Sequence, residues 1–252
     1  VRDVLNYYSA APERLFGKQI PVAGGLDVTF KEPLGVVSVI VPWNFPMPIA
    51  GWGFAPALAA GNTVVLKPAE LTPLTAMRLG QLALAAGIPE GVFTVLAGKG
   101  SVVGERFVTH PDVRKVCFTG STAVGQGIMR KAADQLKRVT LELGGKSANI
   151  VFADADVERA AASAPMSFLD NAGQDCCART RILVQRRVYD AFMERFEAAI
   201  EDGTFKSDAF TRSLSLLNEL PDLQVKAILS NVSKPGLADF LLQVRTQARK
   251  SV

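Results

Sequence analysis

The segment NAGQDCCART, residues 171–180, places two adjacent cysteines in a chain that has only three. A cysteine thiolate is a strong nucleophile, so either Cys176 or Cys177 could attack an electrophilic carbon. The alternative is a buried pair of small side chains, and the polar neighbours argue against it: Gln174, Asp175 and Arg179. A disulfide between adjacent cysteines is geometrically strained and less favoured than either interpretation.

The other reactive side chains offer no histidine base. Cys117 lies in the apolar run KVCFTG and is expected in the core. The only histidine, His110, lies in VTHPDV at an expected helix end, where a capping or surface role is favoured. This position leaves no good candidate for a Cys–His pair or a Ser–His–Asp triad. Any catalytic base in the chain would therefore be a carboxylate.

Strand-like and helical segments alternate along residues 36–143. Val-rich runs bounded by Gly or Pro predict five strands, at residues 36–41, 63–66, 92–96, 115–118 and 138–143. Helical patterns lie between them, at residues 49–60, 73–86, 102–109 and 122–134. Nearly continuous apolar strands that each precede a helix are typical of a parallel sheet with both faces covered. The predicted fold class is therefore α/β, a doubly wound parallel sheet, with ligands at the carboxyl ends of its strands.

Polar residues follow several of the predicted strands. In PWNFP two prolines fix the backbone around Asn44, whose amide could donate to an oxyanion, although a turn role is favoured for this residue alone. In KPAE, Lys67 supplies a cation and Glu70 a carboxylate that could accept from ribose hydroxyls, a weak signal by itself. In FTGSTAVG the expected start of a helix could offer backbone N–H groups to a pyrophosphate. The alternative is that Ser121 is an ordinary N-cap, which explains the serine but not the flanking glycines. The chain lacks GxGxxG, so any dinucleotide is held differently from the usual Rossmann mode.

Composition places the chain among globular proteins. Its 252 residues are 48% hydrophobic and 21% charged, which suits one large or two modest domains. The 28 basic and 24 acidic residues are scattered, so no nucleic-acid partner is expected. Pro and Gly break the apolar runs well short of a membrane span, so no membrane partner is expected either. Three cysteines cannot form a disulfide framework, and this usage predicts a cytoplasmic location.

Five motifs occur in order along the chain: PWNFP, KPAE, FTGSTAVG, LELGGKS and GQDC. Together they resemble the NAD(P)-dependent aldehyde dehydrogenases over roughly residues 1–201, and five linked motifs are far more specific than one. The resemblance implies an NAD-binding domain at residues 1–142 and a partial α/β catalytic domain at residues 143–202. The segment GKQIPVAGGLDVTFKEP, residues 17–33, reads as two short strands and matches the family's oligomerisation hairpin, which implies a homo-oligomer.

The resemblance assigns catalytic roles to three residues. The family's nucleophile follows Gly-Gln by one variable residue, which implies Cys176 and makes Cys177 a bystander. The implied oxyanion donors are the Asn44 side chain and the Cys176 backbone N–H. Glu142, in LELGGKS, matches the general base, which would need a pKa raised by partial burial. Relatives that transfer the acyl group to coenzyme A usually lack this carboxylate, so hydrolysis to a free acid is implied.

The resemblance also implies a site for NAD at the ends of the strands. Its members are Ile40, Val41, Pro42, Trp43, Lys67, Glu70, Gly100, Gly120, Ser121 and Leu143. Lys67 and Glu70 are expected at the adenosine ribose and Ser121 at the pyrophosphate. The Glu70 carboxylate would repel a 2′-phosphate, which favours NAD over NADP while leaving dual use open. No metal is expected.

The chain departs from the family pattern after residue 202, where the expected second half of the catalytic domain is missing. In residues 203–252 apolar residues recur at helical spacing and predict three short amphipathic helices: Leu214, Leu217 and Leu220, then Val225, Ile228 and Leu229, then Leu237, Phe240, Leu241 and Val244. Pro221 and Pro235 are the expected breaks. No family is recognised in this segment. The chain is therefore interpreted as a truncated family member with a helical tail of unknown origin.

Two classes of function follow from these patterns. The first is an NAD-dependent aldehyde dehydrogenase that oxidises a small-molecule aldehyde to a carboxylic acid through a cysteine thiohemiacetal and a thioester. The second is a catalytically weak or inactive nucleotide-binding or interaction protein derived from such an enzyme. Production of NADH from simple aldehydes would separate the two.

Overall fold

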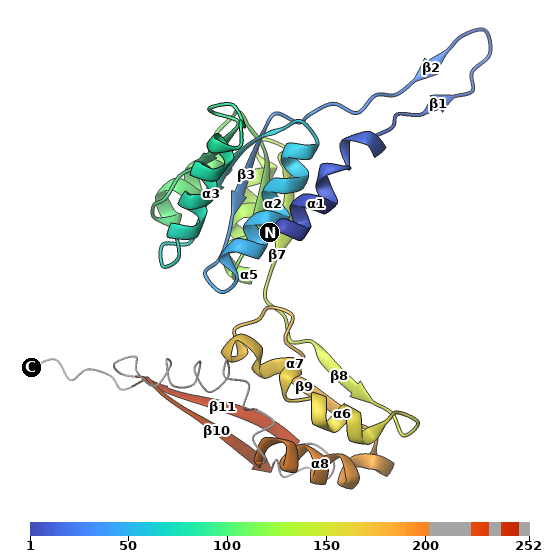
Figure 1. Ribbon diagram of the computed structural model, residues 1–252, viewed down its shortest axis with the longest axis vertical. Coiled ribbons are helices and arrows are strands. Elements are labelled where there is room, and N and C mark those ends of the chain that lie inside the picture. The colour runs from blue at the N-terminus through green and yellow to red at the C-terminus, as the bar shows by residue number, and fades with distance from the viewer. Residues whose placement is uncertain (202–222, 232–237, 247–252) are drawn as a thin grey trace, which may run out of the picture. The chain divides into compact units, whose positions relative to one another are not determined.

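The computed structural model describes residues 1–201, 223–231 and 238–246 (Figure 1). It divides into two compact units, Val1–Gly144 and a second that begins at Gly145, and each is described by itself. This division lies close to the boundary predicted after residue 142, while the functions assigned to the two domains stay predictions. Within the described residues, no helix is long and apolar enough to cross a membrane.

The first unit is built on a parallel sheet with the strand order β5-β4-β3-β6-β7 (Figure 1). The strands are β3 (Val36–Ile40), β4 (Thr63–Lys67), β5 (Phe93–Val95), β6 (Val113–Thr119) and β7 (Arg138–Glu142). The helices between them are α2 (Pro46–Ala59), α3 (Leu74–Ala85), α4 (Glu105–Thr109) and α5 (Thr122–Ala133). The helix predicted at residues 102–109 is a π-helical turn, Gly100–Gly104, joined to α4. The predicted doubly wound α/β fold is confirmed.

Both faces of this sheet are buried. Val37 and Val39 of β3 belong to a core cluster with residues of α2 and α3. Ile40, on the same strand, belongs to a different cluster that includes Phe107 of α4 and Ile128 of α5. Successive side chains of a strand point to opposite faces, so these two clusters lie on opposite sides of the sheet. Packing on both sides explains why the strands read as continuous apolar runs.

A glycine and a buried amide fix how α2 lies on the sheet. A Cβ at Gly53 of α2 would lie 2.4 Å from Cγ1 of Val39, so the helix approaches β3 at a point where no side chain fits. The Asn62 side chain is buried and accepts two consecutive backbone N–H groups that precede β3, at 2.6 and 3.1 Å. Its own amide donates to the Ala57 carbonyl at 3.0 Å. Asn62 therefore ties the end of α2 to the chain that enters β3.

A β-arm extends from the first unit. Helix α1 (Arg2–Ser9) and a 3₁₀ turn (Pro12–Arg14) precede two strands, β1 (Gln19–Ile20) and β2 (Asp27–Val28). The strands pair antiparallel around a loop in which Gly24 has a φ of 74°, a conformation that glycine adopts without strain. The arm projects away from the sheet (Figure 1). The hairpin predicted within residues 17–33 is confirmed, and its oligomerisation role stays a prediction.

The second unit has a two-stranded parallel sheet and three helices among its described residues. The strands are β8 (Ala148–Val151) and β9 (Arg181–Val184), and the helices are α6 (Val157–Ser163), α7 (Met166–Leu169) and α8 (Tyr189–Glu201). A short 3₁₀ turn lies at Arg186–Val188, and a turn with left-handed residues lies at Asp170–Gly173. The core of this unit includes Phe168 of α7 together with Phe192 and Phe196 of α8. Packing of these rings holds the helices together.

The helical prediction is wrong for the described part of the tail. The chain instead forms β10 (Leu223–Asn231) and β11 (Ala238–Thr246), which pair antiparallel along their lengths. Apolar residues also occupy every second position of β10, at Leu223, Val225, Ala227 and Leu229, and a period of two suits a strand. A nine-residue segment is short enough to fit both periods, which explains the error. The helix predicted at residues 214–220, Leu237, and the breaks at Pro221 and Pro235 lie outside the described residues.

We expect Gly53→Ala to destabilise the first unit, because the added methyl group must displace Val39 or move α2 away from β3. Overpacking of this kind lowers the free energy of unfolding by about 1–3 kcal/mol. The matched control is Gly127→Ala in α5, where a Cβ meets nothing within 4 Å. Alanine is a better helix former than glycine by about 0.5–1 kcal/mol, so the control should gain stability. Urea unfolding of both variants checks the prediction, and equal effects would contradict it.

Candidate active site

The parallel register brings predicted site residues of the first unit to one edge of the sheet. Ile40 lies opposite Lys67 in the β3–β4 pairing, and the Val41 N–H donates to the Lys67 carbonyl at 3.1 Å. Beyond β6, the Gly120 N–H donates to the Glu142 carbonyl at 3.1 Å. These positions end neighbouring strands, so the carboxyl edge gathers them as the sequence predicted.

A buried cation and an oriented carboxylate lie on this edge. Lys67 is 4% exposed, and its Nζ donates to the Pro68 carbonyl at 2.9 Å. Burial lowers the pKa of the Lys67 ammonium, and the negative charge of Glu70 opposes that shift. Glu70 is exposed, and its Oε1 accepts the Gly100 N–H at 3.0 Å. Three predicted cofactor residues therefore lie together although Gly100 is far from the others in sequence.

The start of α5 is suited to an anion. Ser121 precedes the helix, but within the described residues its side chain makes no capping hydrogen bond. The first turn of α5, all of it described, contains no acidic residue, so its N–H groups keep the positive potential that attracts phosphate. Farther along the helix, a Cβ at Gly125 would lie 2.5 Å from Cδ2 of Leu143, which places Leu143 against α5. The uncapped helix start, the Glu70 carboxylate and the buried Lys67 fit a dinucleotide.

The PWNFP turn joins β3 to α2. Pro42 is half-buried, and Trp43 is 46% exposed. Asn44 is half-buried and lies two residues before Pro46, which begins α2. Proline is favoured at a helix start because its missing N–H would have no partner there. The prolines thus hold Asn44 at the strand end, and its role as an oxyanion donor stays a prediction.

Glu142 ends β7 and differs from its expected surroundings. The Glu142 side chain is exposed among the described residues. A general base that works near neutral pH needs a carboxyl pKa raised by burial or by negative neighbours. The resemblance requires partial burial for this role, and Glu142 as the general base stays a prediction.

Cys176 lies in a tight loop of the second unit. Before it, Asn171, Ala172 and Gly173 adopt left-handed backbone conformations, with φ values of 49°, 57° and 74°. Cys176 is half-buried, and its carbonyl oxygen would lie 3.1 Å from a Cβ at Gly145. Gly145 is the second glycine of LELGGKS, so two of the five motifs meet at this point.

The two adjacent thiols have different surroundings. The Cys177 Sγ lies 3.2 and 3.3 Å from the two carboxylate oxygens of Asp175, and the Cys177 N–H donates to Asp175 at 3.2 Å. The hydrogen bond to this carboxylate raises the pKa of the Cys177 thiol, with smaller contributions from burial and negative charge. Cys177 therefore stays protonated to a higher pH than a free cysteine. The sequence shows an acid beside two cysteines but not which thiol it faces.

The remaining reactive side chains have structural surroundings. Cys117 packs against the core, and burial raises the pKa of its thiol. His110 follows α4, and its Nδ1 accepts the Asp112 N–H at 3.2 Å within a local turn. Among the described residues, the one group of possible metal ligands is Asp175, Cys176 and Cys177, whose ligand atoms lie within 4.8 Å of one another. The hydrogen bonds between the first and last of these residues account for that spacing.

Comparisons with known proteins agree on one family. The family model described as "Aldehyde dehydrogenase family" matches residues 1–215. An aldehyde dehydrogenase of Enchytraeus buchholzi is 47% identical over 230 residues, which cover 90% of this chain and 46% of that protein. A solved NAD-dependent aldehyde dehydrogenase from Sinorhizobium meliloti is 44% identical with a TM-score of 0.76, covering 78% of this chain and 39% of that one. An NAD⁺ complex of an aldehyde dehydrogenase from Bacillus cereus is 40% identical with a TM-score of 0.73. The match covers 84% of this chain and 40% of that one.

These matches correct the end of the family resemblance and show what share of the relatives' length the chain spans. The sequence patterns limited the resemblance to residues 1–201, whereas the family model continues to residue 215. Residues 203–215 therefore belong to the matched region and not to a tail of unknown origin. The chain spans less than half the length of each of these relatives.

We expect Asp175→Asn to make Cys177 more reactive toward iodoacetamide, because the thiol loses the carboxylate that raises its pKa. A lower pKa gives more thiolate at about pH 8, so the alkylation rate should rise there and its pH profile should move to lower pH. Mass spectrometry of the alkylated Cys177 peptide measures the rate. The control is Asp170→Asn, an exposed acid in the same loop that accepts the Asn171 N–H instead of a thiol. An equal rise in the control would contradict the assignment.

Proposed function

The chain belongs to the aldehyde dehydrogenase family, and from this membership we propose that it oxidises a small aldehyde to a carboxylic acid with NAD. Cys176 of the second unit is the proposed nucleophile, and Asn44 and Glu142 of the first unit are its proposed partners. The observation that carries this proposal is the contact between Cys177 and Asp175. Asp175 favours the protonated form of Cys177, which makes Cys177 a poor nucleophile.

Attack by the Cys176 thiolate begins the proposed reaction. A bond forms between Sγ and the carbonyl carbon, and the carbonyl π electrons move onto oxygen. The resulting thiohemiacetal oxyanion needs hydrogen-bond donors, and the Asn44 amide and the Cys176 backbone N–H are the proposed pair. The close approach of Gly145 to the Cys176 carbonyl supports a fixed backbone here, which a backbone donor requires.

NAD, when bound, supplies the acceptor for the hydride that leaves the aldehyde carbon. Lys67 and Glu70 are proposed to bind the adenosine ribose, and Ser121 with the start of α5 the pyrophosphate. The Gly100 N–H binds one Glu70 oxygen and so orients the other for a hydroxyl group. The remaining proposed lining residues are Ile40, Val41, Pro42, Trp43, Gly120 and Leu143.

Release of the acid needs water and a base. In the proposed step Glu142 takes a proton from water, hydroxide adds to the thioester carbon, and the C–S bond breaks to return the Cys176 thiolate.

A second copy of the chain is the proposed protein partner. The β1–β2 arm and its flanking residues expose large apolar side chains to water, among them Phe16, Leu26 and Phe30. A hairpin is marginally stable by itself, and burial of its apolar side chains against another subunit would stabilise it. This surface supports the homo-oligomer that the family resemblance implies.

We expect Cys176→Ala to abolish acylation by p-nitrophenyl acetate, while Cys177→Ala keeps most of it. Mass spectrometry of the native chain, quenched soon after mixing with the ester, should find the acetyl group on Cys176. Absorbance of released p-nitrophenolate gives the rate, and the two alanine variants serve as controls for each other. Equal losses in both variants, or an acetyl group on Cys177, would contradict the assignment of the nucleophile.

We expect the chain to bind NAD more tightly than NADP, because the Glu70 carboxylate repels a 2′-phosphate. Glu70→Gln should narrow this preference, since it removes the repulsion and also weakens the ribose contact. The matched control is Glu90→Gln, an exposed acid that precedes β5 at the opposite edge of the sheet. Calorimetric titration with both nucleotides measures the preference. Tighter binding of NADP, or the same change in the control, would count against the site.

A further inference from the structure

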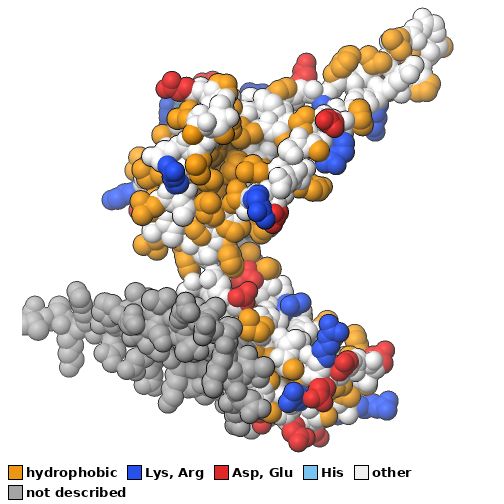
Figure 2. Space-filling model, viewed as in Figure 1, with side chains coloured by type: hydrophobic (Ala, Val, Ile, Leu, Met, Phe, Trp, Pro, Cys, Tyr) orange, Lys and Arg blue, Asp and Glu red, His pale blue; other side chains and the backbone are white. Residues whose placement is uncertain are grey.

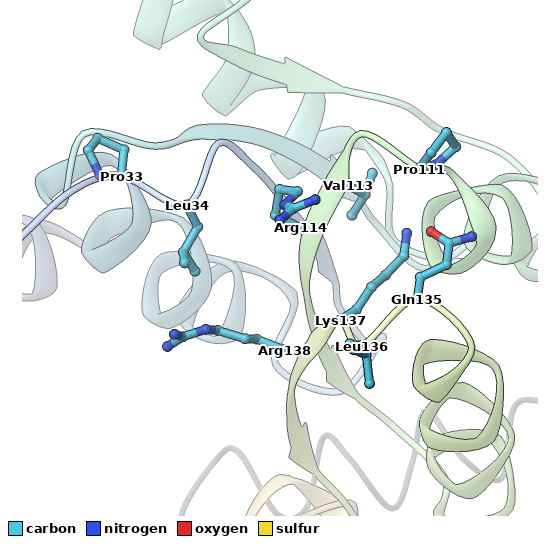
Figure 3. Close-up of a pocket in the computed structure, with 9 residues that line it drawn as sticks. All are labelled: Pro33, Leu34, Pro111, Val113, Arg114, Gln135, Leu136, Lys137 and Arg138. Carbon is cyan, nitrogen blue, oxygen red and sulfur yellow. The ribbon is translucent and has the colours of Figure 1, made fainter.

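A pocket of about 500 Å³ lies at the amino ends of the strands, the opposite edge of the sheet from the predicted cofactor residues (Figure 3). Three stretches of chain line it: the residues that lead into β3, the start of β6, and the turn between α5 and β7. The apolar members are Pro33, Leu34, Pro111, Val113 and Leu136, and the polar members are Arg114, Gln135, Lys137 and Arg138. None of the proposed catalytic or cofactor residues belongs to this lining.

The charged side chains that line the pocket are all positive. Arg114, Lys137 and Arg138 are cationic, and none of the nine described lining residues is acidic. Within the described part of the chain, none of the three cations forms an ion pair. The Lys137 Nζ donates to the His110 carbonyl, a neutral acceptor. Burial, and after it the positive charge of Arg114, lower the pKa of Lys137, and the negative charge of the neighbouring Asp112 opposes that shift.

The backbone holds these cations in place. A Cβ at Gly35 would lie 3.4 Å from Cγ of Arg114, so the stem of that side chain packs against the chain that enters β3. In the turn before β7, the Lys137 N–H donates to the Ala132 carbonyl at 3.0 Å. Figure 3 shows Arg138 extending toward Leu34, on the other side of Arg114 from Lys137. The cations therefore come from fixed elements on different sides of the pocket.

Leu136 brings an apolar side chain to the rim of the pocket. It is 91% exposed and has a φ of 50°. The Lys137 N–H donates to the Ala132 carbonyl at 3.0 Å and closes the C-terminal end of α5, where a left-handed residue is common. A ligand with both an apolar and an anionic part would cover this side chain together with the cations.

We propose that this pocket binds a small organic anion with two negative charges, either a phosphate monoester or a dicarboxylate. Two negative charges would offset most of the repulsion among three cations, and arginine binds phosphate and carboxylate groups through paired N–H donors. The five apolar lining residues suit a carbon skeleton. The volume falls in the range of small-molecule sites, which favours a metabolite over an acidic protein segment. This site is separate from the proposed reaction.

Calorimetric titration of the full chain with inorganic phosphate and with succinate, at constant ionic strength, tests the site. Acetate provides a singly charged comparison and should bind much more weakly. Arg114→Gln and Arg138→Gln should each weaken binding about tenfold or more, because each removes a charged hydrogen-bond donor. The matched control is Arg130→Gln, an exposed arginine of α5 outside the pocket, which should bind as the native chain does. If only phosphate binds, the ligand is identified as a phosphate monoester. If phosphate and succinate both bind, the site also accepts dicarboxylates.

Three results would overturn the proposal. The first is that neither dianion binds the native chain. The second is that both arginine variants keep native affinity, which would place the anion elsewhere, for example at the start of α5. The third is that the arginine variants change the oligomeric state in sedimentation velocity without changing anion affinity, which would assign the pocket to a protein contact. NAD titration of Arg138→Gln should match the native chain and so separates this site from the proposed function.

Discussion

Burial of both faces of the five-stranded sheet constrains everything else in the first unit. Val39 and Ile40 point to opposite faces, and each is covered by a different helical layer. With apolar side chains required on both faces, polar chemistry can lie only at the two edges where strands end. The carboxyl edge holds Lys67 and Glu70, and the amino edge holds the basic pocket around Arg114. A single packing requirement thus produces two separate polar regions on one small domain.

In the second unit, one face of the β8–β9 sheet does not meet this requirement among the described residues. Val151 of β8 and Val184 of β9 face the core, while the alternate residues Ile150 and Leu183 are exposed. Figure 2 shows hydrophobic side chains at the surface of each unit. A two-stranded parallel sheet with a bare apolar face is unfavourable in water, and sheets of this kind are normally covered on both sides. The relatives are about twice as long as the chain, and added strands or another subunit would supply such cover.

Local signals predicted the first unit well, and features that depend on distant packing were missed. Each of the five strands reads as a Val-rich run and lies within two residues of its predicted ends. The contact of Asp175 with Cys177 depends on a backbone turn that residue types alone do not reveal. The exposure of Glu142 likewise depends on tertiary packing that the motif LELGGKS does not reveal. Arg114 and Arg138 line one pocket because β6 and β7 are neighbouring strands, although the two segments carry no shared motif.

The strained turn before the cysteines connects the core of the second unit to its chemistry. Ala172 in a left-handed conformation costs of order 1–3 kcal/mol, and such a residue persists only where its surroundings determine it. The chain is anchored on both sides, because Leu169 and Ala178 are buried in the same core cluster. A backbone hydrogen bond of 2.9 Å between α7 and the residue after Ala178 closes the loop. Asp175 contacts Cys177 within this anchored loop, two residues along the chain. Hydrophobic packing therefore fixes the ends of the loop, while the contact that surrounds the Cys177 thiol with a carboxylate is local.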